Sequence, residues 1–154
     1  MSMPNNRLLN YGQALYEATQ QAMQDDPRVF VMGLGVDDAK GIYGTTLNLH
    51  REFGNTRNFD TPIAEDGMTG VAIGAAMAGM RPIHVHQRMD FVLLCMNQLV
   101  NIAAKTHYMF AGELRVPLVV RAVIGRSWGQ GAQHSQALHA LFMHIPGLKV
   151  FAPT

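Results

Sequence analysis

The sequence predicts an α/β protein in which a parallel sheet is covered by helices on both faces. Short apolar runs that resemble strands alternate along the chain with segments that resemble helices. The runs at residues 29–32 and 116–124 are continuous rather than alternating, which is typical of strands that are buried on both faces of a parallel sheet. We therefore expect the strands to end at one shared edge, where the ligands of such sheets collect.

The first third of the chain is expected to supply two helices, one strand and a loop. Residues 7–24 are predicted as a helix capped by Asn6, and residues 25–27 end it before a strand at 29–32. The apolar face of this helix is predicted at Leu8, Tyr11, Leu15, Ala18 and Ala22. The glycine-rich loop at 33–44 lacks the third glycine of G-x-G-x-x-G and carries two aspartates, so we do not expect it to bind phosphate. A short helix is predicted at 46–53.

The middle of the chain presents one carboxylate, Glu65, at the start of an unusually apolar helix. An extended segment at 58–60 leads to Pro62, and Glu65 and Asp66 follow in what would be a first helical turn. Residues 71–80 contain no charge, and six of the ten are glycine or alanine, which predicts a helix that is buried all round. A carboxylate at this position either complements the helix dipole or serves a binding site.

The remaining segments continue the alternation of strands and helices. A strand is predicted at 83–85, a long helix at 91–108 after Asp90, and a strand at 116–124. The loop at 125–131 contains Arg126 and Trp128. Residues 133–135 are expected to lead into a helix that ends near 143, and a last strand is predicted at 148–152. Loops 33–44, the segment after residue 85 and loop 125–134 should meet at the carboxyl ends of the strands.

The composition indicates a surface that is partly covered by other chains. Hydrophobic residues make up 48% of the 154 residues and charged residues only 15%, and an oligomer or a partner subunit is the simplest cover. A net charge of +1 gives no electrostatic case for nucleic acid or an anionic membrane. The single cysteine, Cys95, is expected to be a buried core thiol, and a reducing, cytoplasmic compartment fits best.

Seven histidines raise the question of a metal site. His84 and His86 alternate on one predicted strand and could share a face, but no H-E-x-x-H motif or cysteine pair accompanies them, so we expect no bound metal. His134 lies in a glycine-flanked turn, where a ring is positioned for proton transfer. A capping or surface histidine is the alternative on this evidence alone. Ser135 lacks the context of a nucleophilic serine.

Several ordered segments carry a resemblance to a known family. They are DDPRVFVMG at 25–33, FDTPIAE at 59–65, GAAMAGMRPI at 74–83, QLVN and AAK within 98–105, GAQHSQ at 131–136 and PGLKV at 146–150. From residue 8 onward the chain resembles the pyrimidine-binding domain of thiamine diphosphate enzymes. It is most similar to the β subunit of the decarboxylating component of 2-oxo acid dehydrogenase complexes of the pyruvate, branched-chain and acetoin types.

The resemblance implies a thiamine diphosphate-binding fold, with residues 1–154 forming one pyrimidine-binding domain without the family's carboxyl-terminal domain. It implies that Glu65 hydrogen-bonds N1′ of the cofactor's aminopyrimidine and that Phe91 lies against that ring. It also implies that His134 assists proton transfer to the substrate or to a lipoyl group. Glu65 and His134 would thus be catalytic, and Glu65 and Phe91 would bind the cofactor.

The same resemblance implies partners. The chain has no Gly-Asp-Gly motif, so Mg²⁺ and the diphosphate are expected on a separate α-type subunit. Contacts with a second copy of the chain and with a lipoyl-bearing acyltransferase are expected as well. The implied activity is oxidative decarboxylation of a 2-oxo acid with acyl transfer to lipoyl groups.

Departures from the family pattern keep two alternatives open. Leu34 and Gly35 stand where relatives usually carry an acidic pair, Val85 stands where a glutamate is common, and Arg88 replaces a small or aromatic residue near the cofactor pocket. The alternatives are a transketolase-like carbon transfer and a non-catalytic, truncated assembly module.

Overall fold

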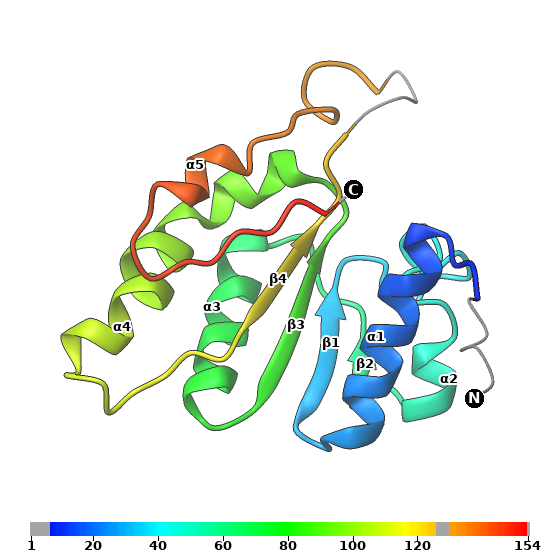
Figure 1. The fold of residues 1–154 in the computed structure, drawn as a ribbon, viewed down its shortest axis with the longest axis horizontal. Helices are drawn as coiled ribbons and strands as arrows, with labels where there is room; N and C mark the ends of the chain where they lie inside the picture. Colours follow the sequence, from blue (N-terminus) through cyan, green and yellow to red (C-terminus); the bar gives the residue numbers. More distant parts are fainter. Residues whose placement is uncertain (1–6, 126–129, 154) are drawn as a thin grey trace, which may run out of the picture.

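A computed structural model describes residues 7–125 and 130–153, and its centre is a parallel sheet with the strand order β2-β1-β3-β4 (Figure 1). The strands are β1 (Val29–Gly33), β2 (Asn58–Phe59), β3 (Arg81–His86) and β4 (Val119–Ala122). Every pairing is parallel, with Val31 of β1 opposite Asn58 of β2 and Ile83 of β3. The predicted α/β fold with a parallel sheet is therefore confirmed.

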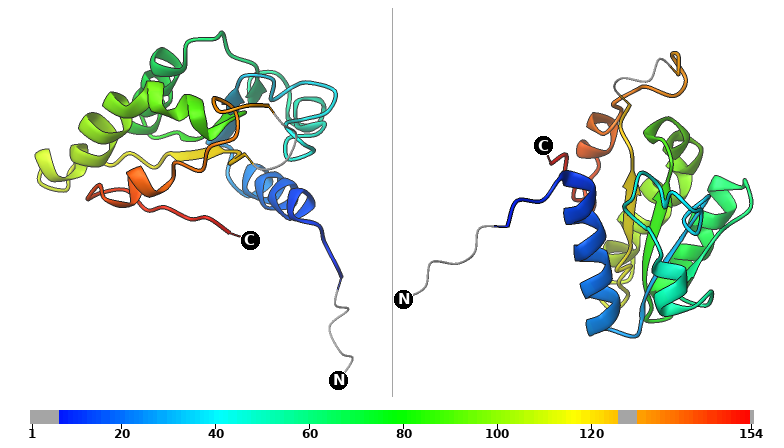
Figure 2. Two further views of the ribbon diagram at one scale, coloured as in Figure 1. Left: turned by 90° about the horizontal axis from the view of Figure 1, so that it is seen from above. Right: turned by 90° about the vertical axis from the view of Figure 1, so that its right-hand side faces the viewer.

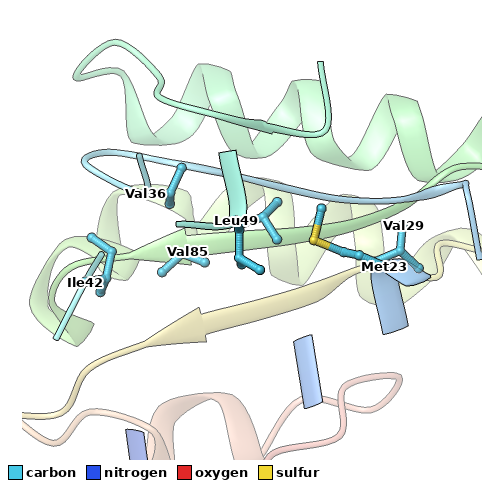
Figure 3. Packing of buried hydrophobic residues seen from close by; sticks show 7 residues of the cluster. Met23, Val29, Val36, Ile42, Leu49 and Val85 are labelled. Carbon is cyan, nitrogen blue, oxygen red and sulfur yellow. The ribbon is translucent and has the colours of Figure 1, made fainter. Parts of the chain in front are cut away.

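β1 is buried on both sides, because helices cover both faces of the sheet. The α-helices are α1 (Tyr11–Asp25), α2 (Leu49–Phe53), α3 (Glu65–Met77), α4 (Ala104–Met109) and α5 (Ala140–Met143). Val29 packs with Met23 of α1 in one apolar cluster (Figure 3). Met32 packs with Ala72 of α3 in another. Because neighbouring strand residues face opposite ways, α1 and α3 lie on opposite sides of the sheet (Figure 2, right).

The first helix begins later than predicted. Asn10 caps α1, because its side chain accepts a hydrogen bond of 2.9 Å from the backbone N–H of Gln13, and the Gln13 side chain accepts one of 3.1 Å from the backbone N–H of Asn10. Asn6, the expected cap, lies outside the described residues. Leu8 is 95% exposed and precedes the helix. The buried residues of α1 are Thr19 and Met23. Ala22 of the predicted apolar face packs against the core, but Tyr11 is 50% exposed, so the face was predicted only in part.

The helix that carries Glu65 is buried on one face only. Val71 is 56% exposed and Met77 is 38% exposed. The buried residues of α3 are Thr69, Ala72, Ile73 and Ala76. The prediction that α3 is buried on all sides was therefore wrong for the isolated chain. Its glycines and alanines lie on the exposed side as well as on the buried side, so they do not indicate burial by themselves.

The long helix predicted at 91–108 is a succession of three kinds of turn. A 3-10 segment, η1 (Met89–Cys95), is followed by a π segment, η2 (Asn97–Ala103), and then by α4. Val92, Cys95 and Leu99 all face one apolar cluster. Because side chains three apart eclipse in a 3-10 helix, the tight first segment keeps Val92 and Cys95 on the same side.

The carboxyl-terminal third is less regular than predicted. The strand predicted at 116–124 is shortened to β4, and the helix predicted from 133 onward is reduced to α5. The strand predicted at 148–152 does not form within the described residues. Leu148 and Val150 pack against the cluster around Phe142 through their side chains, and this burial explains the apolar pattern without a ladder partner. Arg126 and Trp128 lie outside the described residues.

Across residues 7–125 and 130–153, no helix combines the length and the apolarity that a bilayer crossing requires.

Candidate active site

A pocket of about 430 Å³ lies at the carboxyl ends of β1, β2 and β3. All three of the loops that were expected to meet at this edge contribute to it. The lining residues are Leu34, Tyr43, Thr61, Pro62, Ile63, Glu65, Met68, His84, Val85, His86, Gln87, Arg88, Phe91, Gln130 and His134.

The three residues singled out from the sequence come together in this pocket. Glu65 is the first residue of α3 and is half-buried. Phe91 lies in η1, and its ring meets the His134 ring edge-on, with 5.2 Å between the centroids and an interplanar angle of 76°. His134 sits in a turn well before α5 rather than at a helix start, so the predicted helical position was wrong, although the ring does line the pocket.

The segment at residues 60–64, which leads to Glu65, is hydrogen-bonded to the loop after β1. The Asp60 carboxylate accepts hydrogen bonds from the backbone N–H of Gly35, at 2.6 Å, and from that of Thr61, at 2.8 Å. Thr61 is buried, and Pro62 keeps the preceding backbone extended. These contacts fix the entry into α3 and hence the position of Glu65.

A series of buried, hydrogen-bonded polar side chains supports the first turn of α3. The Cys95 thiol donates to the backbone carbonyl of Glu65 at 3.2 Å, and Thr69 Oγ1 lies 3.1 Å from Cys95 Sγ and 3.1 Å from His84 Nε2. Burial raises the pKa of the Cys95 thiol, although the Thr69 contact opposes this shift. Cys95 is therefore the buried core thiol that the sequence predicted.

His84 and His86 do share a face, as predicted. Their ring centroids are 4.4 Å apart in an edge-on arrangement. Burial lowers the pKa of His84, and burial together with the neighbouring His84 lowers the pKa of His86 to about 3. Both rings are therefore neutral at pH 7. Within the part of the chain that the structure describes, no group of three or more His, Cys, Asp or Glu side chains could hold a metal ion.

Several pocket residues were not identified from the sequence. Tyr43 and Gln130 reach the pocket from the loops after β1 and β4, and Met68 reaches it from the first turn of α3. The signal that could have found Tyr43 and Gln130 is their place in loops at the carboxyl ends of strands. Met68 lies three residues after Glu65, on the same side of the helix.

A model of the family described as "Transketolase, pyrimidine binding domain" matches residues 8–154. The pyruvate dehydrogenase E1 component subunit beta of Rickettsia bellii is 47% identical over 141 residues, which cover 92% of this chain and 43% of that protein. The mitochondrial subunit beta-1 of Arabidopsis thaliana is 44% identical over 140 residues, covering 91% of this chain and 39% of that protein. The chain thus spans less than half the length of these relatives.

Among solved structures, one described as "Split gene transketolase, inactive beta4 tetramer" has a TM-score of 0.65 and 20% sequence identity. The match covers 86% of this chain and 39% of that chain. At this identity the likeness shows the fold alone, and it agrees with the parallel sheet and its helices.

Proposed function

Because the chain belongs to the family of transketolase pyrimidine-binding domains, we propose that it forms the pyrimidine-side half of a thiamine diphosphate-dependent 2-oxo acid dehydrogenase active site. The observation that carries this proposal is the position of Glu65, a carboxyl group at the wall of a pocket that His134 and Phe91 also line. The similarity to two subunits named as pyruvate dehydrogenase E1 components supports the reaction class.

The residues of the pocket fit an aminopyrimidine. Glu65 offers a carboxyl group that can exchange a proton with a ring nitrogen, while Phe91, Met68 and Val85 offer apolar surface to a flat ring. Glu65 and Phe91 would therefore hold this part of the cofactor. The diphosphate and Mg²⁺ are assigned to a partner subunit, since the described residues contain no acidic cluster for the ion.

Bound thiamine diphosphate supplies the electron sink that decarboxylation of a 2-oxo acid requires. Glu65 would share a proton with the ring nitrogen N1′ once the cofactor is bound. The contacts of Asp60 and Cys95 fix the first turn of α3 and so hold the carboxyl group of Glu65 in place. His134 exchanges a proton at an imidazole nitrogen with the substrate or with the lipoyl group. Phe91 restrains the His134 ring by its edge-on contact.

The proposed assembly contains an α-type subunit that binds the diphosphate, a second copy of this chain and a lipoyl-bearing acyltransferase that accepts the acyl group. The exposure of Val71 and Met77 on α3 supports the need for partners, since a partner that covers them would remove apolar side chains from water.

The test is the substitution Glu65→Gln in the assembled enzyme. The amide cannot exchange the proton, so decarboxylation is expected to fall by at least about 10²-fold. Asp66→Asn is the matched control, because Asp66 is the next residue, is exposed and, among the described residues, accepts a hydrogen bond only from the backbone N–H of Gly67. Full activity of Glu65→Gln would refute the assignment. An assembled wild-type protein that binds the cofactor but decarboxylates no 2-oxo acid would favour an assembly module.

A further inference from the structure

Arg88 is a buried cation in the pocket, and no acid of the described chain neutralises it. Its side chain is 8% exposed and lines the pocket together with Glu65 and His134. The guanidinium lies 5.3 Å from the centroid of the Tyr43 ring and donates one hydrogen bond to the Gln130 side chain. The ion pairs found among the described residues join Asp26 or Glu17 to other arginines.

This environment differs from that of the other arginines that lie partly inside the protein. Arg57 donates to the backbone carbonyls of residues 23, 26 and 29, and Arg121 donates to the hydroxyls of Thr19 and Thr45. Both bridge structural elements through several protein oxygens. Among the described residues Arg88 has one such oxygen, that of Gln130, although a guanidinium carries five N–H donors.

A buried charge with unused donors is costly unless an anion completes its surroundings. The two histidines that line the same pocket are neutral, because burial lowers the pKa of each. Glu65, the one acid among the lining residues, is assigned to the ring nitrogen of the cofactor. No other acid of the described residues lines the pocket, and the carboxylate of a ligand matches the planar fork of a guanidinium.

The reacting carboxylate of a 2-oxo acid is a poor candidate for this role. It loses its charge as carbon dioxide leaves, so an ion pair to it would stabilise the bound substrate more than the transition state and would slow the reaction. A second, distal carboxylate keeps its charge throughout. An ion pair to that group holds the substrate equally well before and during bond breaking.

We propose that Arg88 binds the distal carboxylate of the substrate, so that the enzyme selects 2-oxo dicarboxylic acids over monocarboxylic ones. This inference deepens, and rests on, the proposed decarboxylation at the same site. Arg88 acts as the specificity-determining residue, and Gln130 and the Tyr43 ring orient its guanidinium from the loops after β4 and β1.

The experiment uses the full-length protein assembled with its diphosphate-binding subunit and compares 2-oxoglutarate with pyruvate. Wild type is expected to favour 2-oxoglutarate over pyruvate by at least tenfold in kcat/KM. Removing one partner of a buried charge pair lowers affinity by about 30-fold or more. Arg88→Gln is expected to lower kcat/KM for 2-oxoglutarate by that factor, mainly through KM, and to leave pyruvate nearly unchanged. Arg88→Lys should restore part of the preference.

Arg51→Gln is the matched control, because it removes the same charge from an exposed position in α2. A second readout does not depend on turnover. Glutarate, an unreactive dicarboxylate, should raise the melting temperature of wild type and of Arg51→Gln but not that of Arg88→Gln, while butyrate should raise none of them.

Three results would overturn the inference. They are a wild-type preference for pyruvate, an equal loss on both substrates in Arg88→Gln, and a loss of thiamine diphosphate binding with unchanged selectivity, which would assign Arg88 to the cofactor. The first of these needs no variant to fold. If wild type decarboxylates neither acid while glutarate still stabilises it through Arg88, the proposed function fails but the carboxylate site stands.

Discussion

Replacing His86 by asparagine should remove a large part of the protein's sensitivity to mild acid. His86 is 4% exposed in β3, where its ring lies edge-on to that of His84. Its pKa falls from 6.5 to about 3, first because of burial and second because of His84. The folded protein therefore keeps this ring neutral at pH 5, whereas the unfolded chain protonates it.

The sign and size follow from this difference in proton binding. Between pH 6.5 and pH 3 the unfolded state binds more protons, so the free energy of unfolding decreases as the pH falls through this range. With an unfolded pKa of 6.5, His86 alone should cost about 2 kcal/mol of stability between pH 8 and pH 5. The figure holds for any folded pKa well below 5. His84, whose pKa burial also lowers, adds a loss in the same direction.

The assay is urea unfolding of wild type and His86→Asn at pH 8, 7, 6 and 5. The variant is expected to be less stable at pH 8, because it loses packing, but its stability should fall with pH by about 2 kcal/mol less than that of wild type. His144→Asn, at an exposed position, should keep the wild-type slope. If His86→Asn and wild type lose stability in parallel down to pH 5, the ring is protonated in the folded protein and the reasoning fails.

Two further substitutions test the fold. At Gly147, φ is +99° and an added Cβ would lie against the carbonyl oxygen of Ala104, so Gly147→Ala should lower the free energy of unfolding by about 3 kcal/mol. The control Gly79→Ala, at φ +97° with open space around it, should cost only about 1 kcal/mol. Equal losses of the two variants in thermal unfolding would contradict the close approach at Gly147. Asn10→Ala should lower the free energy of unfolding by about 1 kcal/mol, because it removes the cap of α1. The control Gln21→Ala, at an exposed position of the same helix, should cost less than about 0.5 kcal/mol. A loss for Asn10→Ala no larger than that of Gln21→Ala would contradict a stabilising role of the capping box.

The elements that could be predicted from the sequence are those whose burial leaves a strong pattern. β1 is apolar without interruption because both of its faces are covered, β4 is apolar except for Arg121, and Pro62 marks the entry to α3. Residues 148–152 have a similar pattern but form no strand, since side-chain burial against a cluster gives the same sequence signal as burial in a sheet. The changes of helical winding from Met89 to Met109 leave no signal in composition, because they follow from tertiary packing.

For the site, the sequence could place residues but not their surroundings. The rule for carboxyl ends and the resemblance together brought Glu65, Phe91 and His134 to one pocket. The sequence showed that Arg88 departs from the family pattern, but not that its charge is buried without an acid. That property depends on which side chains of distant segments approach it, and Gln130 lies 42 positions away in the chain.

The position of α3 links the site to the assembly. Glu65 begins this helix at the pocket, and the outer face of the same helix leaves Val71 and Met77 exposed. A partner that covers this face would remove apolar surface from water and thereby stabilise the helix. It would also restrain the carboxyl group at the helix start, whose inner side is already held by Cys95. Under the proposed function, cover of this face by a partner would both stabilise the chain and order half of the active site, and catalysis would require the assembled enzyme.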